Sequence, residues 1–558
     1  MLENIGKLID TDVLVIGGGA GGLWAALSAR RHFPSGKVTL LDAHMIGRTG
    51  HTAFSNAWMV VVTPEDDLDA CVRDIVQGNE WIAEQELIRE VLSLSYDQML
   101  QLEKMGLQFP KEEDGKFVRR PTRGLRITKV LKPIGGGLEF CWVLRKALER
   151  EGVEFAERVF VTDLLRDERG NVAGAVGIDG RTGEFHILRA KATIVATNSV
   201  TFRAGFARDL TGTGPILAYQ AGAAVTNAEF GYLRPATPKF YFEGITFAIQ
   251  DGARFVNSAG APFMEKYEPD WSDEADVQLI SKAMVMEKKA GNAPLYLDMS
   301  RIPEEKREDY LHSSVAWMDY FYKKLGNRAR IDMFGRTEYF PFYQMTKMAI
   351  KTDSGCRASV PGLFAAGLAQ ASCATHFAGF HIGACNGTGW IAGRNAATLA
   401  QEIKAPSLNE AEVELLKRKI RGGFGDATER SEDDLLFELQ KLIFRHDVSI
   451  LKTEGRLSAA LGVLGGIEEK LAGTKASNTH GFVRLRETEA MVIAAKLIFA
   501  ASRVRHESRL SHIREDYPGR DDRNWLRWVL IRREGDQPQI STEPIATPLV
   551  PAPNGNSQ

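Results

Sequence analysis

The chain has 558 residues, 44% of them hydrophobic and 25% charged, and these proportions are ordinary for a globular protein. A chain of this length exceeds what one hydrophobic core supports, so we expect two or three domains. The net charge of −2 and the pI near 6.6 give no general attraction to nucleic acids or to anionic membranes. We therefore expect neither as a partner.

The chain has no apolar run that approaches the roughly 20 residues of a membrane helix, and 59–62 is a typical maximum. The first predicted strand follows Met1 so closely that no room is left for a signal peptide. We therefore expect a cytoplasmic protein without an integral membrane segment.

The five cysteines are scattered along the chain and include no CxxC pair. They are Cys71, Cys141, Cys356, Cys373 and Cys385. This pattern is typical of reduced cytosolic thiols, and it provides neither a zinc site nor an iron–sulfur cluster. We predict no metal site in this chain, so a cluster that exchanges electrons with it must lie on another chain.

The N-terminal segment predicts a dinucleotide-binding fold. A buried-type strand at 12–16 leads into the glycine-rich loop 17–22, and a helix-type segment begins at Leu23. A second strand at 38–41 ends on Asp42. Strand, glycine turn, helix, strand and acidic residue follow one another within about 30 residues, as this fold requires.

The glycines of the loop have separate roles in such a fold. Gly17 permits the tight turn, Gly19 lets a pyrophosphate approach the backbone, and Gly22 allows close packing of helix on strand. The helix N-terminus then presents unpaired N–H groups to the phosphates. Asp42 is placed to accept hydrogen bonds from ribose hydroxyls.

Only one such fingerprint occurs, and this favours FAD over a pyridine nucleotide as the cofactor. Further strands are predicted at 174–178 and 193–197, and another at 362–367. Because the last strand lies far from the first along the chain, we expect a discontinuous FAD-binding domain interrupted by an inserted domain.

Composition changes indicate where the domains meet. The stretch from 231 to 345 is aromatic and loop-rich, whereas helical periodicity dominates after about residue 405. The end of the chain is rich in Pro, Thr, Ser and Asn, which is typical of disorder. We predict an FAD-binding domain at 1–230 and 346–404, a capping domain at 231–345, a helical domain at 405–540 and a disordered tail at 541–558.

Several stretches resemble the fumarate reductase/succinate dehydrogenase flavoprotein family, and the resemblance covers residues 10 to about 535. The segment 211–214 is similar to the TGxG of that family, and 294–300 matches its P-x-Y-L-D-x-S signature. Arg505, Arg509 and the segment 512–526 resemble its C-terminal signature. The resemblance implies an α/β fold with a GxGxxG FAD-binding (Rossmann-like) domain, an inserted α+β capping domain and a C-terminal helical domain.

The resemblance and the glycine loop together predict the residues that contact FAD. These are Gly17, Gly19, Gly22, Asp42, Ala43, Gly50, His51, Thr52, Thr197 and Gly367. In succinate dehydrogenases a histidine at the place of His51 carries a covalent flavin link, whereas soluble fumarate reductases have asparagine there. Both a covalent link and a plain polar contact stay open for this chain.

The departures from the family concern its dicarboxylate site. The arginine that delivers a proton in the family falls near Ala248, and a family histidine falls near Gln344. The segment 376–381 lacks the arginine of the family's carboxylate clamp, and Leu368 replaces an acidic residue that contacts the flavin. We therefore expect the dicarboxylate chemistry to be lost. In lacking this clamp the chain resembles the α chain of adenylylsulfate reductase, which receives electrons from a small ferredoxin-like partner.

Three residues are candidates for catalysis. His376 and His381 lie in a segment that the family places beside the isoalloxazine ring, where an imidazole can exchange protons near pH 7. Arg234 could bind an anionic substrate because it is permanently charged. For each of them an ordinary structural role, in the core or in an ion pair, is the alternative.

The leading hypothesis is an FAD-dependent oxidoreductase subunit that exchanges two electrons between flavin N5 and a small substrate under the capping domain. Its partner would be a small ferredoxin-like iron–sulfur subunit. One alternative is a fumarate reductase/succinate dehydrogenase-type enzyme with a shifted clamp. Another is an electron-transfer subunit without a substrate of its own.

Overall fold

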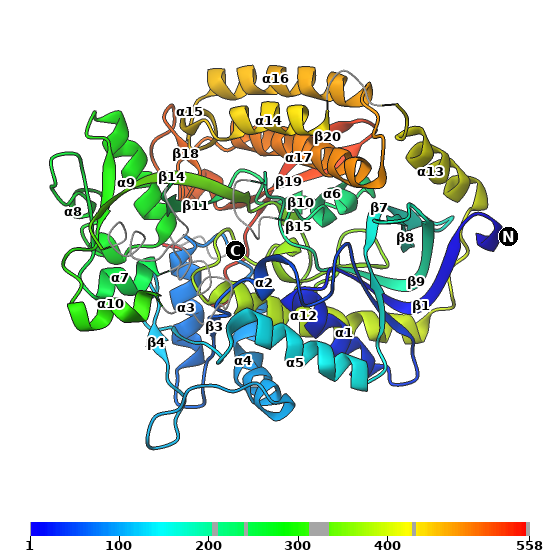
Figure 1. The fold of residues 1–558 in the computed structure, drawn as a ribbon, viewed down its shortest axis with the longest axis horizontal. Helices are drawn as coiled ribbons and strands as arrows, with labels where there is room; N and C mark the ends of the chain where they lie inside the picture. The colour runs from blue at the N-terminus through cyan, green and yellow to red at the C-terminus, as the bar shows by residue number, and fades with distance from the viewer. Residues whose placement is uncertain (1, 204–209, 239–243, 312–333, 427–430, 554–558) are drawn as a thin grey trace.

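A computed structural model describes residues 2–203, 210–238, 244–311, 334–426 and 431–553. Three parts lie together in Figure 1: the FAD-binding part at the bottom, the capping part at the left and the C-terminal helices along the top. The α/β class and this three-part architecture were both predicted from the sequence, and both are confirmed. The exact domain boundaries stay predictions.

The FAD-binding part is built on a seven-stranded sheet with the strand order β6-β2-β1-β9-β8-β7, in which β16 also pairs with β9. Its parallel strands are β6 (Glu154–Glu157), β2 (Val38–Asp42), β1 (Lys7–Ile16), β9 (Phe185–Val195) and β16 (Leu363–Ala365). β7 (Val159–Arg166) and β8 (Val172–Asp179) extend it in antiparallel fashion. Because β16 pairs with β9, the chain returns to this sheet after the capping part, as predicted.

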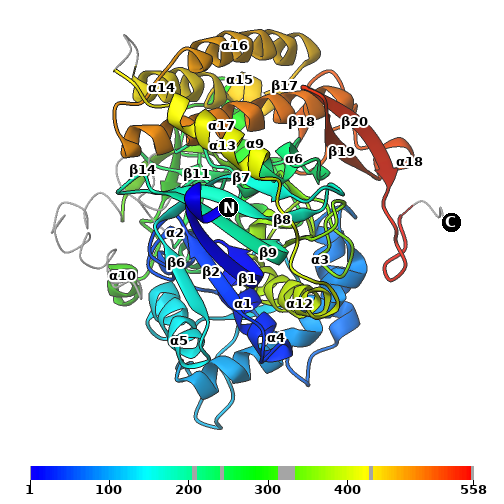
Figure 2. The same cartoon turned by 90° about the vertical axis from the view of Figure 1, so that its right-hand side faces the viewer.

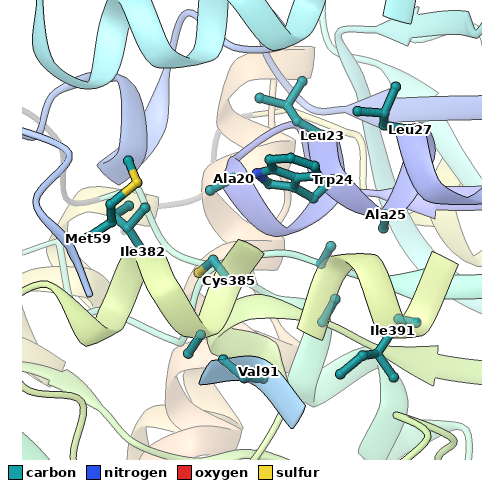
Figure 3. Packing of buried hydrophobic residues seen from close by; sticks show 14 of the residues in the cluster. Ala20, Leu23, Trp24, Ala25, Leu27, Met59, Val91, Ile382, Cys385 and Ile391 are labelled. Carbon is teal, nitrogen blue, oxygen red and sulfur yellow. The ribbon is translucent and has the colours of Figure 1, made fainter. Parts of the chain in front are cut away.

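Helices α1 (Ala20–His32), α5 (Gly136–Arg150) and α12 (Phe380–Glu402) lie along one face of this sheet (Figure 2). α1 and α12 approach so closely that their small residues decide the contact. A Cβ at Gly393 would lie 2.2 Å from the carbonyl oxygen of Ala25, so only glycine fits there. Figure 3 shows Leu23, Trp24 and Ala25 of α1 above Cys385 and Ile391 of α12. This packing holds the glycine loop against the segment that begins α12.

The capping part contains its own antiparallel sheet, with the order β11-β14-β13-β12. Its strands are β11 (Gly231–Ala236), β14 (Arg336–Thr346), β13 (Leu295–Asp298) and β12 (Arg254–Val256). Its helices are α7 (Ile245–Gln250), α8 (Met264–Tyr267), α9 (Val277–Lys289) and α10 (Glu304–Leu311). A separate cluster of buried side chains, including Phe255, Met284 and Leu297, forms its core.

The C-terminal part begins with two helices that have side-chain caps at their N-termini. Asn409 accepts hydrogen bonds from two backbone N–H groups at the start of α13, and Ser431 forms a capping box with Asp434 in α14. The helices are α13 (Glu410–Gly422), α14 (Glu432–Ile443), α15 (His446–Ser449), α16 (Glu454–Ala472) and α17 (Thr479–Val504).

The predicted disorder of the tail 541–558 is wrong for its described residues. β20 (Gln537–Pro544) pairs with β19 (Arg527–Glu534) in a hairpin, which joins β10 (Val225–Thr226) and β15 (Ala349–Ile350) in a four-stranded sheet. Beyond the hairpin, the side chain of Val550 is buried. The composition was misleading because partners distant in sequence satisfy the backbone of this segment. Residues 554–558 lie outside the described part.

The arginines of the C-terminal signature form a buried ion network. Arg505 donates to Glu229 and to Glu507, at 2.8 Å in each case, and Arg509 donates to Glu507 at 2.7 Å. All four side chains are almost completely buried. Because an unpaired buried charge is costly, this pairing holds the C-terminal part against the segment around Glu229.

The remaining elements connect these parts. They are α2 (Gly50–Ala53), β3 (Met59–Val60), α3 (Leu68–Gly78), α4 (Gln85–Met105), β4 (Arg120–Pro121), β5 (Lys129–Leu131), α6 (Gly214–Gln220), β17 (Leu451–Lys452), β18 (Ile513–Arg514) and α18 (Asp522–Trp525), with short 3-10 turns at Leu2–Asn4, Ser272–Glu274 and Gly367–Ala369. Within the described ranges, no helix has the length and apolar character needed to cross a membrane.

Candidate active site

The glycine loop between β1 and α1 has the geometry that a dinucleotide requires. Gly17 has a φ of +117°, and a Cβ there would lie 2.5 Å from the carbonyl oxygen of Ala196. A Cβ at Gly22 would lie 1.7 Å from the carbonyl oxygen of Gly17, so the helix can pack on the strand only if residue 22 is glycine. At Gly19 the nearest atom is the hydroxyl oxygen of Thr52, at 3.5 Å. The backbone at Gly19 is therefore open to a ligand.

Asp42 stands at the end of β2 and stabilises this loop. Its carboxylate accepts hydrogen bonds from the backbone N–H of Gly18 at 2.6 Å and from that of His44 at 2.7 Å. The same residue lines the cavity above the loop. Its predicted contact with a ribose stays a prediction.

A cavity extends from the glycine loop past the end of β2 toward α17. All the predicted FAD contacts except Gly22 line it. Gly22 faces the strand, consistent with a packing role. The cavity combines the open backbone at Gly19 with the N-terminus of α1, which has no side-chain cap, so its residues fit the pyrophosphate of FAD. FAD bound there would supply two-electron transfer to a neighbouring substrate.

Asn198 and Glu487 are among the polar residues of this cavity that sequence reasoning missed. Asn198 follows β9, and Glu487 lies on α17. Glu487 is buried and pairs with Arg203, while burial raises the pKa of its carboxyl group. Asn198 follows the predicted strand 193–197 directly, which was the available signal, whereas nothing near Glu487 in the sequence indicates a cofactor.

His51 lies on α2 and lines both this cavity and a second one. Its Nδ1 is 2.7 Å from the amide nitrogen of Asn198. Because an amide N–H₂ group can only donate, the Nδ1 of His51 accepts this bond, and any proton of the neutral ring is on Nε2.

The second cavity, of about 240 Å³, lies between the FAD-binding and capping parts. It shares His51, Thr52, Leu368 and Cys385 with the first cavity. A molecule in it would therefore meet the ligand of the first cavity at these residues. Its lining includes basic groups from both parts, and the described lining contains no aspartate or glutamate. The basic residues are His51, Arg123, Arg234 and His381.

Two of the three predicted catalytic residues lie in this second cavity. His381, at the start of α12, and Arg234, on β11, line it, but His376 does not. His376 is buried and lies close to His381, with 5.4 Å between the ring centroids. His376 can therefore act on the cavity only through a neighbour.

Lys347 connects the two histidines. Its Nζ lies 3.5 Å from Nδ1 of His376 and 3.4 Å from Nε2 of His381. The Nδ1 of His381 is 3.2 Å from the carbonyl oxygen of Phe377, which can only accept. His381 therefore donates through Nδ1 and accepts the ammonium of Lys347 at Nε2. The ring of Tyr232 lies 4.9 Å from the same ammonium.

Burial determines the charges in this cluster. It lowers the pKa of Lys347 to about 8, and it lowers the pKa values of His376 and His381 well below the ordinary value. The charge of Lys347 adds to the effect on both histidines. At pH 7 the cluster thus consists of one cation and two neutral imidazoles.

The positions at which the sequence resemblance predicts the dicarboxylate site carry no arginine. Ala248 is buried on α7 and does not line the second cavity, whereas Gln344 lines it and is 2% exposed. Arg254, a conceivable substitute, forms an ion pair with Asp273 at 3.2 Å. The aromatic residues of the capping part have different surroundings. Phe247 lines the second cavity, whereas Tyr343 is packed in a hydrophobic core cluster.

The chain thus combines a single glycine-loop site with an adjoining cavity lined by basic side chains, the arrangement expected of a flavin-dependent oxidoreductase. The chain belongs to the FAD binding domain family, whose model matches residues 12–387. Residues 438–556 match the model described as fumarate reductase flavoprotein C-term.

Individual proteins are similar over almost the whole chain. One subunit of the fumarate reductase (CoM/CoB) of Methanothermobacter marburgensis is 27% identical, over 95% of this chain and 98% of that protein. The mitochondrial succinate dehydrogenase [ubiquinone] flavoprotein subunit of Oryza sativa subsp. japonica is 25% identical, over 96% and 90%.

Two solved structures show the same fold. A variant of E. coli quinol fumarate reductase has a TM-score of 0.86 at 21% identity and covers 98% of both chains. Adenylylsulfate reductase of Archaeoglobus fulgidus has a TM-score of 0.80 at 22% identity, over 97% of this chain and 96% of that one. The predicted family, the FAD cofactor and the FAD-dependent oxidoreductase activity are confirmed.

Proposed function

We propose that this chain transfers two electrons between its FAD and a small anionic substrate bound in the second cavity. We propose further that a small ferredoxin-like iron–sulfur protein exchanges these electrons with the flavin, and that the protein acts in the cytoplasm. His381 and Arg234 are the residues that we assign to the substrate, and His376 supports His381.

One observation carries this proposal. The cofactor cavity and the second cavity meet at His51, Thr52, Leu368 and Cys385, and the described lining of the second cavity is basic without any acid. Positive groups in a partly enclosed site attract an anion more strongly than they would in bulk water, because their field is less screened there. A neutral or cationic substrate would gain nothing from this lining.

Lys347 adds a further positive charge behind the cavity. Its ammonium holds His381 in one tautomer, with the proton on Nδ1. The ordinary basicity of an imidazole is lost at His381, since its pKa is lowered by burial and by Lys347. His381 therefore orients a substrate as a neutral hydrogen-bonding group. The titratable proton next to His381 is on Lys347, whose pKa is about 8.

The iron–sulfur partner is supported by the distribution of cysteines. All five thiols are buried and free, and no group of three metal-ligating side chains occurs within the part of the chain that the structure describes. The similar proteins from M. marburgensis and O. sativa are named as subunits. Electrons that arrive singly would thus come from a cluster on another chain.

Two experiments test the proposal. The first is to purify the protein with the product of the neighbouring gene and to measure iron and flavin in the complex. The second is anaerobic reduction by a reduced ferredoxin, followed by addition of unsaturated carboxylates and sulfur oxyanions while flavin absorbance is recorded.

Reoxidation by at least one anion supports the enzyme, and the flavin spectrum should recover within seconds. A chain that accepts electrons from ferredoxin but responds to no anion would instead be an electron-transfer subunit without a substrate of its own. The apoprotein of the Gly19→Val variant serves as the control for reactions that need no flavin.

A further inference from the structure

We infer that Arg123 binds the anionic group of the substrate, and that this substrate is a monocarboxylate with a planar apolar body. The inference rests on the proposed function, which assigns an anion to the second cavity. The inference names the residue that recognises the anion. It also gives the chemical class of the rest of the substrate.

Arg123 lies in the loop between β4 and β5 and lines the second cavity. Its Nε and Nη1 are buried, and neither has a hydrogen-bond partner within the described ranges. No ion pair of Arg123 occurs there either. Burying guanidinium N–H groups without an acceptor is unfavourable, and an anion in the cavity would provide acceptors through charge-assisted hydrogen bonds.

The neighbours of Arg123 hold its backbone in place. The hydroxyl of Thr122 donates to the carbonyl oxygen of Ala378 at 3.1 Å. Gly124 has a φ of +73°, and a Cβ there would lie 3.2 Å from the ring of Phe377. Both contacts are to the segment that leads into His381, so the loop is fixed relative to the other side of the site.

The basic residues of the cavity indicate one anionic group. His51 accepts a hydrogen bond from Asn198, and His381 is neutral between Phe377 and Lys347. Arg234 has its Nε 3.5 Å from a backbone carbonyl oxygen. Two cations outside the lining, Arg120 and Lys132, lie over the rings of Phe247 and Trp58, each at 5.5 Å from the ring centroid. Arg123, whose Nε and Nη1 have no partner in the described ranges, is therefore the guanidinium that we assign to the carboxylate, and Arg234 is left to contact the rest of the substrate.

The rest of the cavity suits a flat apolar body. The rings of Trp58 and Phe247 line it and pack on each other, with 5.2 Å between centroids and an angle of 41°. Ile245, Val277 and Ile382 add aliphatic surface. Gln344 offers one polar contact, because its amide oxygen is buried without a partner in the described structure. A second carboxylate would meet these apolar groups at a high desolvation cost.

The experiment measures binding to the oxidised holoprotein by calorimetry. The probes are trans-cinnamate, fumarate and the neutral cinnamyl alcohol. The variants are Arg123→Gln, Arg123→Lys and, as a matched control, Arg126→Gln. Arg126 lies on the same loop, and its guanidinium stacks over the ring of Trp271 at 4.6 Å. Flavin content of each variant reports whether the fold is retained.

We expect cinnamate to bind the unchanged protein more tightly than fumarate does. Arg123→Gln should weaken cinnamate about 10- to 100-fold, the loss typical of a charge-assisted hydrogen bond. Arg123→Lys should weaken cinnamate binding less, and Arg126→Gln should leave it unchanged. Cinnamyl alcohol should bind the unchanged protein and Arg123→Gln with equal affinity.

Equal cinnamate affinity in the unchanged protein and in Arg123→Gln would overturn the role of Arg123. Tighter binding of fumarate, or no binding of cinnamate, would overturn the substrate class. Reoxidation of the reduced flavin distinguishes either of these outcomes from a failure of the proposed function. If another anion reoxidises the reduced flavin equally well in Arg123→Gln, the enzyme stands without this recognition. If no anion does so in the unchanged protein, the enzyme itself is refuted.

Discussion

Gly19 and Gly22 lie three residues apart in one loop, yet their substitution should have different consequences. A side chain at residue 19 meets only the hydroxyl of Thr52, at 3.5 Å, and otherwise projects into the cofactor cavity. Gly19→Val should fold with nearly unchanged stability but bind no FAD, so the purified protein should be colourless.

Gly22→Ala is the matched comparison. Its Cβ would lie 1.7 Å from the carbonyl oxygen of Gly17, so this variant should lose several degrees of thermal stability or fail to fold. Flavin absorbance and thermal denaturation of both variants check the pair. A yellow Gly19→Val protein would show that the pyrophosphate does not lie at this loop.

His51 lines both cavities, a position compatible with a covalent link to the flavin and with a plain polar contact. If His51 carries the flavin, acid precipitation should give a yellow pellet and a colourless supernatant. His51→Ala should then release the flavin into the supernatant. Release from the unchanged protein would restrict His51 to a polar contact, with its Nδ1 held by Asn198.

The affinity for an anion should depend on pH through Lys347. Burial lowers the pKa of Lys347 to about 8, so its ammonium is charged below this pH and neutral above it. The facing thiols of Cys373 and Cys385 have pKa values raised to about 12 by burial and stay neutral throughout. Both facing histidines, His376 and His381, are neutral at this pH as well.

Binding of cinnamate should therefore weaken roughly three- to tenfold as the pH rises from 7 to 9.5, since a nearby positive charge is lost. Lys347→Met, which keeps the apolar stem, should bind more weakly at pH 7 and show a flat profile. Calorimetric titration over this pH range provides the test. If cinnamate affinity in the unchanged protein did not change with pH, Lys347 would have no effect on substrate binding.

The elements differ in how well the sequence predicted them. The β1–α1–β2 unit was predictable because strand periodicity, glycine spacing and Asp42 are all local features. The caps of α13 and α14 were predictable for the same reason. By contrast, Lys347 meets His376 and His381 only after β14 and α12 come together, and no local pattern in the sequence records such a contact.

The terminal segment is a second case in which contacts between distant residues could not be predicted from the sequence. Its composition is typical of disorder, but the side chain of Gln85 accepts hydrogen bonds from the backbone N–H of Leu549 and Val550, at 2.9 and 2.8 Å. The indole N–H of Trp81 donates to the carbonyl oxygens of Val550 and Pro551. These partners are separated from the tail by most of the chain, so composition could not indicate them.

Removing residues 545–558 should therefore destabilise the protein without removing FAD. The truncation leaves the buried amide of Gln85 without partners, which costs about 1–3 kcal/mol, and lowers the melting temperature by a few degrees. Flavin content should be unchanged, because no residue of this segment lines the cofactor cavity. An unchanged melting temperature would show that the segment is not bound in solution.

At the scale of the whole molecule, the FAD-binding part, the capping part and the C-terminal part each contribute to the path that we propose for electrons. The first two line the second cavity, which adjoins the cofactor cavity, and Glu487 on α17 of the third lines the cofactor cavity. The fold matches that of a quinol fumarate reductase, but Ala248 and Gln344 stand where the sequence resemblance predicts residues of a dicarboxylate site. The substrate is thus predicted to change while the fold is kept.

The most direct test of this account is fumarate-driven reoxidation of the reduced protein, followed anaerobically by flavin absorbance. We predict no reoxidation within minutes at millimolar fumarate, because Arg123 would pair with one carboxylate while the second would meet the apolar lining around Trp58 and Phe247. The same sample should accept electrons rapidly from a reduced ferredoxin. Reoxidation by fumarate within seconds would contradict the account and establish a working dicarboxylate site in this chain.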